Sequence, residues 1–219
     1  MEGCEKPFRV APPGGDDMVM LIADVDISTL AGFPCAGSEI GGADLDLIID
    51  GGVVDGCDGG WKLNGRNAAQ LITGGHYVTN AVDRAVQASG NPGSGNGATV
   101  MIRDSVVQSN GGGNGSAPRG GVTVDKKGRL DLGTSTDAGG NKICRNQDGN
   151  SSDRDVHINR TDINVDGYGN YWRFDGGAPV VVKAVPEGTE VEATFDDGGS
   201  SNRLKDEDDP LPGIGISCQ

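Results

Sequence analysis

Aromatic residues are scarce in this chain of 219 residues, which contains four Phe, two Trp and three Tyr. A β-sandwich of this length normally buries more aromatic side chains than that. Glycine is abundant instead: its 39 residues keep no three-residue period, which excludes a collagen helix. Short runs of Val, Ile and Leu recur between turn residues, which argues against wholesale disorder. The composition therefore favours a solenoid, whose narrow interior is filled by small aliphatic side chains.

Positive charge is also in short supply. The chain has 18 Lys and Arg residues against 32 Asp and Glu residues, and its formal net charge is −14. The basic residues are scattered, and Lys126–Lys127 is their only adjacent pair. Because phosphate binding needs a clustered basic face, nucleic acid is not expected as a partner. The negative charge provides solubility, with cation binding as the alternative.

Long apolar runs are missing as well. The N-terminal stretch MEGCEKPFRVAPPGG is polar and rich in Gly and Pro, so it is neither a signal peptide nor a membrane span. We therefore expect no membrane span anywhere in the chain. If the protein is exported to the cell surface or beyond, the signal peptide is not part of this sequence.

Five cysteines are present, and none belongs to a CxxC zinc or redox motif. For an exported protein we expect two disulfides and one unpaired thiol, with the pairing left open. The alternative is a reduced cytosolic protein with five buried thiols. The residues are Cys4, Cys35, Cys57, Cys144 and Cys218.

A repeat of ten-residue blocks organises the middle of the chain. LIIDGGVVDG begins at Leu47, LITGGHYVTN at Leu71 and MIRDSVVQSN at Met101, and DVHINRTDIN (155–164) follows the same design. Each block has an aliphatic pair, a polar or Gly corner, a second short strand and a Gly or Asn stop. Each unit alone buries too little, so the blocks must stack as coils of a parallel β-helix. Stacking places aliphatic ladders inside, and Asn side chains at the corners bond the backbone of the next coil.

The chain divides into three parts on this interpretation. Residues 1–17 are expected to form an irregular N-terminal arm, and residues 18–173 the parallel β-helix. Residues 174–219 are expected to form a C-terminal hairpin or cap with an acidic tail. The hairpin is indicated by PVVVKAVPEGTEVEATF (179–195), and we expect it to cover the open end of the solenoid.

Two segments within the β-helix allow other interpretations. The segment 28–42 contains Gly, Pro and a cysteine, which predicts a loop. The segment 80–90 has apolar residues at helical spacing followed by Gly90, which allows a helix of about two turns as an excursion from the solenoid.

One later stretch resembles a known family. LDLGTSTDAGGNKICRNQ (130–147), followed by GYGNYW (167–172), is similar to the right-handed parallel β-helix repeat proteins of bacterial surfaces, whose broad relatives include the pectate-lyase-like superfamily. The resemblance implies an all-β, right-handed parallel β-helix in an extracellular or cell-envelope setting. Members range from polysaccharide lyases and hydrolases to binding and adhesive modules, so the fold alone assigns no activity. The matching positions are Leu130, Asp131, Leu132, Gly133, Thr134, Gly140, Asn141, Ile143, Gly169, Asn170 and Trp172.

Three aspartates are the candidates for a metal site. A calcium-dependent lyase needs several carboxylates that converge on one cation, and a basic residue near the sugar. Asp44 and Asp46 alternate along one expected strand and Asp50 follows them, so these residues would be the Ca²⁺ ligands. The alternative is that all three are solvent-facing turn formers. No other cofactor is expected.

Catalytic residues are not expected in this chain. His76 and His157 are the only histidines, and no nucleophile elbow or flanking signature accompanies either one. A pair of carboxylates for glycoside hydrolysis cannot be singled out among 32 acidic residues.

Four aromatic residues are the candidates for ligand binding. Aromatic faces pack on the apolar faces of sugar rings, so Trp61, Tyr77, Tyr171 and Trp172 would form a glycan platform if they shared one exposed face. The alternative is that Trp172 closes the solenoid end and Trp61 covers a loop.

These observations predict a secreted or cell-surface, non-catalytic β-helix scaffold for adhesion, glycan binding or assembly. Its expected partner is a polysaccharide or a cell-surface glycan. One alternative is a polysaccharide lyase or glycoside hydrolase of the pectate-lyase-like type. The other is a structural subunit that self-associates through the exposed strand edges at the solenoid ends.

Overall fold

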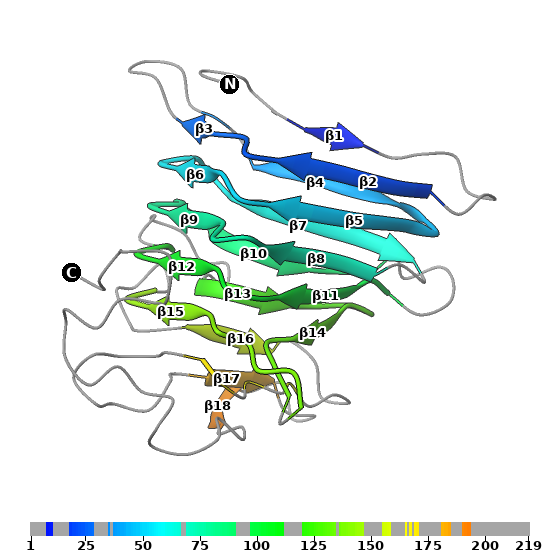
Figure 1. The fold of residues 1–219 in the computed structure, drawn as a ribbon. Helices are drawn as coiled ribbons and strands as arrows, with labels where there is room; N and C mark the ends of the chain where they lie inside the picture. Colours follow the sequence, from blue (N-terminus) through cyan, green and yellow to red (C-terminus); the bar gives the residue numbers. More distant parts are fainter. Residues whose placement is uncertain are drawn as a thin grey trace.

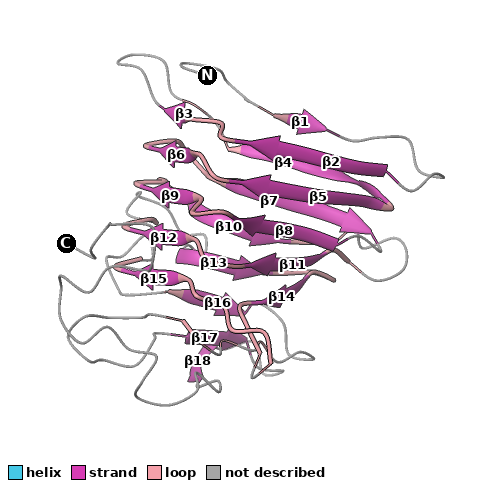
Figure 2. Ribbon diagram, in the orientation of Figure 1, coloured by secondary structure: helices cyan, strands magenta, loops and turns pink. Residues whose placement is uncertain are grey.

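The computed structural model is a β-solenoid in which short strands stack along three faces (Figure 1). The described residues contain strands and loops but no helix (Figure 2). The expectation of an all-β parallel solenoid is therefore confirmed. The structure describes residues 8–10, 18–28, 35, 37–66, 69–90, 97–111, 120–134, 136–146, 155–158, 165, 167, 169–170, 181–184 and 190–193.

Three sheets run along the solenoid, and through β16 every third strand of the chain joins the same sheet. Sheet 1 contains, in spatial order, β1 (Arg9–Val10), β4 (Ser38–Ala43), β7 (Trp61–Arg66), β10 (Arg84–Ala88), β13 (Gly120–Val124), β16 (Val156–Ile158), β17 (Val181–Ala184) and β18 (Glu190–Ala193). Sheet 2 contains β2 (Met18–Ala23), β5 (Leu45–Asp50), β8 (Ala69–Thr73), β11 (Thr99–Ile102) and β14 (Arg129–Asp131). Sheet 3 contains β3 (Ile27–Ser28), β6 (Val53–Asp55), β9 (Tyr77–Thr79), β12 (Val106–Gln108) and β15 (Lys142–Cys144).

Period-two alternation explains why each strand has a buried and an outward face. Along β5, Leu45, Leu47 and Ile49 are buried, whereas Asp46 and Asp50 are exposed. Parallel pairing in register then stacks the inward residues of successive coils into ladders. The core that results is built of small aliphatic residues, and Trp61 is its largest fully buried side chain.

Asparagine side chains tie neighbouring coils together at two corners. At one corner, Asn110 donates from Nδ2 to the carbonyl of Val78 at 3.0 Å, and Asn146 does the same to the carbonyl of Val107 at 3.0 Å. At the other corner, Asn141 donates to the carbonyl of Ile102 at 2.7 Å. These bonds satisfy backbone groups that a turning chain would otherwise bury without partners. The prediction that Asn side chains bond the backbone of a neighbouring coil is confirmed, and these bonds run to the preceding coil.

A glycine pair makes one of the sharp corners between sheets 2 and 3. Gly51 and Gly52 have φ values of +67° and +78°, which place both in the left-handed region. A Cβ on Gly52 would also collide with the backbone of Val25 in the preceding coil. The turn therefore needs glycine for both its conformation and its close contact.

Three of the predicted repeat blocks stack on one another, but their register is partly shifted by one residue, since Ile48 rather than Leu47 pairs with Leu71. Leu71 pairs with Met101 in sheet 2, and Val54 pairs with Val78 in sheet 3. The fourth block is misplaced, because Val156–Ile158 pairs with β13 in sheet 1 rather than with the sheet 2 strands. An aliphatic residue at every second position occurs in all three sheets, so this pattern does not identify the face.

Strands are present in three segments for which the sequence predicted a loop, a helix or an irregular arm. The end of the expected loop 28–42 is β4, whose Ile40 is buried in the core. The helix allowed at 80–90 is wrong, because Arg84–Ala88 is β10 and pairs with both β7 and β13. Arg9–Val10 of the expected irregular arm forms β1 and pairs with β4. Parallel pairing on both sides overrides the local helical spacing of β10.

The predicted C-terminal hairpin is present. β17 pairs in parallel with β16, and β18 pairs antiparallel with β17, so the hairpin extends sheet 1. Figure 1 shows these two strands beyond the last coil, at the end of the molecule opposite to β1. A function of the hairpin as a cap stays a prediction.

Candidate functional site

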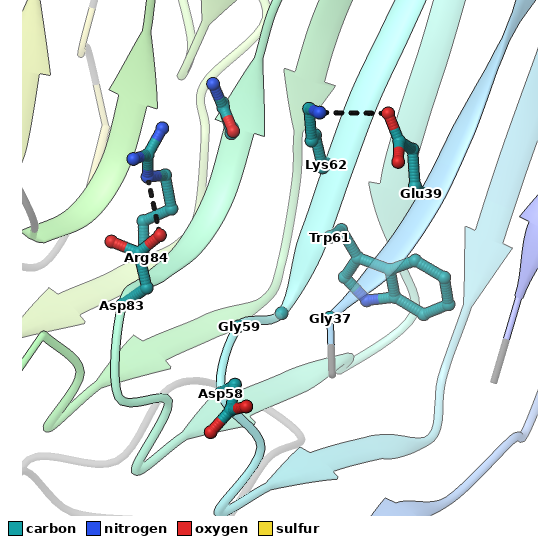
Figure 3. A pocket seen from close by; sticks show the side chains of 10 residues that line it. Gly37, Glu39, Asp58, Gly59, Trp61, Lys62, Asp83 and Arg84 are labelled. Carbon is teal, nitrogen blue, oxygen red and sulfur yellow. Dashed lines mark hydrogen bonds and ion pairs between the residues drawn. The ribbon is translucent and has the colours of Figure 1, made fainter. Parts of the chain in front are cut away.

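A pocket of ≈ 260 Å³ lies on the outer side of sheet 1, at the corner where three successive coils enter the sheet (Figure 3). Its polar side chains come from β4, β7 and β10 and from the corners that precede them. We call it the sheet 1 pocket. It is lined by Gly37, Glu39, Asp58, Gly59, Gly60, Trp61, Lys62, Asp83, Arg84 and Gln87.

Glycines form the hollow part of the sheet 1 pocket. A Cβ on Gly60 would collide with the carbonyl oxygen of Ala85, and one on Gly37 would lie 3.0 Å from the carbonyl carbon of Gly59. A Cβ on Gly59, in contrast, would lie no closer than 3.7 Å to any other residue's heavy atom. Close stacking of the coils therefore excludes a side chain at Gly60, whereas a Cβ at Gly59 would make ordinary van der Waals contacts.

A disulfide holds the corner beside the pocket. Cys35 and Cys57 are bonded with a Cα–Cα distance of 4.8 Å, which links two neighbouring coils. The backbone N–H of Asp58 donates to the carbonyl of Cys35 at 2.7 Å, and that of Val82 donates to the carbonyl of Cys57 at 2.9 Å. Cys144 is also disulfide-bonded. The prediction of disulfides is confirmed for Cys35–Cys57.

Polar side chains in register form one rim of the pocket. Glu39 pairs with Lys62, and Lys62 pairs with Gln87, across β4, β7 and β10. The Lys62 ammonium lies 2.9 Å from Glu39 Oε1, and Asn64 donates to the same oxygen at 2.8 Å. Gln87 donates from Nε2 to Asp125 Oδ2 at 2.6 Å. These contacts restrain the rim side chains in one arrangement.

The opposite rim consists of Asp58, Asp83 and Arg84, as Figure 3 shows. Arg84 Nε lies 3.3 Å from Asp83 Oδ2. The backbone N–H of Asp83 donates to the carbonyl of Asp58 at 2.7 Å, which places the two aspartates at equivalent positions of adjacent coils. The carboxylate of Asp58 is exposed and makes no ion pair or hydrogen bond within the described part of the chain.

Trp61 does not provide the sugar platform that the sequence suggested. Its side chain is only 1% exposed, and its ring lies 5.8 Å from the ring of Phe8. Trp61 and Leu63 are alternate residues of β7 and both point inward, whereas Lys62 between them points out to the rim. The expectation of an exposed Trp61 face is wrong, because the indole is buried in the core.

The other predicted aromatic residues do not join Trp61. Tyr77 is half-buried on β9 in sheet 3, where its hydroxyl accepts a hydrogen bond of 2.8 Å from Gln108 Nε2. Trp61 and Tyr77 therefore belong to different sheets. Tyr171 and Trp172 lie outside the described residues.

His76 is part of a buried hydrogen-bonded chain. Its Nε2 accepts a 2.7 Å hydrogen bond from Trp61 Nε1, and its Nδ1 donates to the carbonyl of Gly51. An indole N–H only donates and a carbonyl only accepts, so the imidazole is neutral with its proton on Nδ1. Burial lowers the pKa of His76 below the ordinary value of 6.5, and hydrogen bonds with the backbone of Gly51 and Gly52 oppose this shift. The arrangement is structural, since the ring is only 1% exposed.

The three candidate metal ligands are not brought together. Asp44 lies at a corner with φ +57°, whereas Asp46 and Asp50 are exposed on β5. Asp46 Oδ1 instead accepts the backbone N–H of Ala69 at 2.9 Å. No group of three or more His, Cys, Asp or Glu side chains within the described ranges is placed to hold a metal ion.

The site thus belongs to a β-solenoid with a polar pocket. Neither a protein family, nor a curated protein, nor a solved structure matches this chain. In the part of the chain that the structure describes, no helix is long and apolar enough to cross a membrane.

The polar rim residues of this pocket are not among those predicted from the sequence. Asp58 and Asp83 are one coil apart, as are Lys62 and Gln87. The CDGGW segment that ends at Trp61 was the available signal, because two successive glycines beside a strand indicate close backbone contact or an open surface. Identifying the rim also required the coil length in sheet 1, which differs from that in sheet 2.

Proposed function

We propose that this protein is a non-catalytic β-solenoid that binds carbohydrate in the sheet 1 pocket, outside the cell or on its surface. The observation that carries the proposal is the composition of the pocket, which combines a glycine-lined hollow with carboxylate, ammonium, guanidinium and amide groups. Sugar hydroxyls donate and accept hydrogen bonds, so a rim that offers both kinds of group complements them.

Rigidity supports binding without a large ordering cost. The rim side chains stand on paired strands and on corners linked by backbone hydrogen bonds, and two ion pairs restrain four of them. A site that is ordered before the ligand arrives loses little conformational entropy on binding. This property suits a scaffold that recognises a repeated surface polymer.

The proposed location rests on the disulfide and on the family resemblance. Disulfides such as Cys35–Cys57 persist in oxidising compartments outside the cytosol. The motif around 130–147 resembles right-handed β-helix proteins of bacterial surfaces, and kinship with the pectate-lyase-like superfamily is part of this proposal. Adhesion or assembly at the cell envelope would follow from glycan binding.

A glycan array with a pocket-filling variant tests the proposal. Gly59→Leu adds a side chain at the wall of the pocket, where its Cβ would make only ordinary van der Waals contacts. We expect the wild-type protein to bind a restricted set of glycans and Gly59→Leu to lose them. The matched control is Ala69→Leu, which adds the same side chain at an exposed position on sheet 2.

Product release from polysaccharides provides the contrary outcome. Asp58 and Asp83 are two carboxylates at equivalent positions of adjacent coils, and an enzyme that used them on a polysaccharide would generate new reducing ends or unsaturated products. Degradation of a polymer that is lost in Gly59→Leu would replace the binding proposal with a catalytic one. Absence of any glycan binding would refute the proposal.

A second candidate function is self-association through the first coil. β2 pairs with β5 over six consecutive residues, and its other edge has no partner strand among the described residues. Its segment MVMLIA has no charge or proline, and Val19 and Leu21 are 72% and 62% exposed. Edge strands without such protective residues pair readily with another chain. A second copy joined at β2 would continue the hydrogen-bond ladder of sheet 2.

Sedimentation velocity over a range of protein concentrations tests this second function. We expect a concentration-dependent shift from monomer to larger species, which Leu21→Lys abolishes by placing a charge on the edge. Thr73→Lys, on the third strand of the same sheet, is the matched control because it adds the same charge away from the edge. Monomers at all concentrations would contradict self-association.

A further inference from the structure

The charges that line the sheet 1 pocket do not cancel. Three carboxylates face two cations, which leaves a formal charge of −1 in the pocket. Lys62 is held by Glu39 at 2.9 Å and Arg84 by Asp83 at 3.3 Å. Both cations are thus already compensated by a carboxylate.

Asp58 is the charge left over. Its side chain is exposed at the pocket, and its carboxylate forms no ion pair or hydrogen bond with the described residues. The backbone of Asp58 is fixed by its bond to the carbonyl of Cys35 and by the adjacent Cys35–Cys57 disulfide. The carboxylate therefore extends from a fixed backbone at the edge of a polar pocket and is available to a cation.

The net charge of the whole protein also favours a cationic ligand. A net charge of −14 repels polyanions such as uronate polymers and raises the local concentration of cationic ligands. A divalent metal ion is a poor fit, because no group of three ligating side chains surrounds Asp58 within the described ranges. An ammonium group needs only one carboxylate for a charge-assisted hydrogen bond, and it has three N–H donors.

We infer that the sheet 1 pocket selects an amino sugar with a free, protonated amine, whose ammonium group binds the carboxylate of Asp58. This inference rests on the proposed carbohydrate binding and specifies its ligand class. The paired rim side chains and Gln87 then contact the neutral hydroxyls of the same sugar. N-acetylation would remove the ammonium charge and leave Asp58 without its partner.

Calorimetric titration with three oligosaccharides of equal length tests the inference. The probes are oligomers of glucosamine, of N-acetylglucosamine and of galacturonate, at a pH where the glucosamine amine is protonated. We expect the glucosamine oligomer to bind most tightly, and Asp58→Asn to weaken its binding about tenfold or more. High salt should weaken the glucosamine complex of the wild type far more than that of Asp58→Asn.

Asp50→Asn is the matched control variant. Asp50 is an exposed aspartate on sheet 2, so its replacement removes one negative charge, as Asp58→Asn does, without touching the pocket. Equal affinity for the acetylated oligomer, tighter binding of galacturonate, or an equal loss in Asp50→Asn would each overturn the amino-sugar inference. In each of these cases the proposed function would still be supported if the wild type bound a glycan and Gly59→Leu abolished that binding.

Competition with an amine that is not a sugar tests whether the pocket recognises the sugar or only its positive charge. Spermidine, which carries amines without a sugar, should compete only weakly with the glucosamine oligomer. Complete competition by spermidine at equal concentration would overturn the inference, because the pocket would then recognise any amine. If no oligosaccharide binds and the broader glycan array is also negative, the inference and the proposed function both fail.

Discussion

Trp61 and His76 form a buried hydrogen bond of 2.7 Å between the indole Nε1 and the imidazole Nε2. Trp61 lies on β7 of sheet 1, and His76 lies at the corner between β8 and β9. His76 also donates to the carbonyl of Gly51 in the preceding coil. One neutral imidazole therefore joins two coils and two sides of the solenoid interior.

This bond predicts that the fold weakens in mild acid. Protonated His76 would present an N–H to the N–H of Trp61, and burial lowers its folded-state pKa below 6.5. As pH falls below about 6.5, the unfolded chain takes up a proton first, so the free energy of unfolding drops. The slope from one such proton is at most about 1.4 kcal/mol per pH unit. Urea unfolding at a series of pH values measures it.

The control for the pH effect is His76→Asn, which does not titrate in this range. The free energy of unfolding of His76→Asn should be lower than that of the wild type at every pH. It should stay nearly constant over the pH range in which the wild-type value falls. An equal slope in the variant would assign the effect to another group, such as His157. Asp137 does not interfere, because the hydrogen bonds and charge of Arg103 lower its pKa below 3.8.

Gln70 predicts a stabilising substitution. Its side chain is fully buried in the ladder between Leu47 and Val100, and neither its Nε2 nor its Oε1 has a hydrogen-bond partner among the described residues. Gln70→Leu removes a desolvated amide and keeps a similar volume, so we expect the free energy of unfolding to rise by about 1–2 kcal/mol. Chemical denaturation measures the change. A loss of stability would mean that the amide has a partner, such as a buried water molecule.

The asparagine ladder predicts the opposite result. Asn141 accepts the backbone N–H of Ser105 at 3.1 Å and donates to Ile102 and Asn170 at 2.7 and 2.8 Å. Asn141→Leu leaves these buried groups unpaired, so we expect a loss of about 3 kcal/mol in unfolding free energy. Asn64→Leu, whose side chain bonds Glu39 at the surface, should cost about 1 kcal/mol or less. Similar losses in both variants would contradict a special role for the ladder.

The Cys35–Cys57 disulfide predicts a coupled loss of stability and binding. The bond closes a loop with a sequence separation of 22 residues. Its removal in the double Cys35→Ser, Cys57→Ser variant should cost about 3 kcal/mol by the chain-entropy relation. Because the bond adjoins Asp58, the variant should also bind pocket ligands more weakly under conditions where it is fully folded. Thermal unfolding and titration measure the two effects, and unchanged affinity would exclude a role of the disulfide in the pocket.

Local patterns were sufficient to predict some of the elements. The blocks at Leu71 and Met101 identified stacked coils. The corner role of asparagine followed from its side-chain chemistry. The same patterns failed at Arg84–Ala88 and Val156–Ile158, where pairing with neighbouring coils decided the structure and the sheet.

Local sequence patterns did not predict the candidate site. Trp61 was chosen because aromatic residues bind sugars, yet its position inside the coil depends on which parity of β7 faces the core. The rim brings together Glu39, Lys62 and Gln87 from three coils, and their contact depends on the register of three strands.

The sequence by itself determined the class of architecture, because small aliphatic residues at alternate positions, separated by Gly and Asn corners, can bury enough surface only by stacking as coils. The tertiary structure alone decided the position of the pocket and of its unpaired carboxylate. The physical reason is that coil lengths vary with the corner loops, so only the register of the stacked strands determines which side chains become neighbours on the surface.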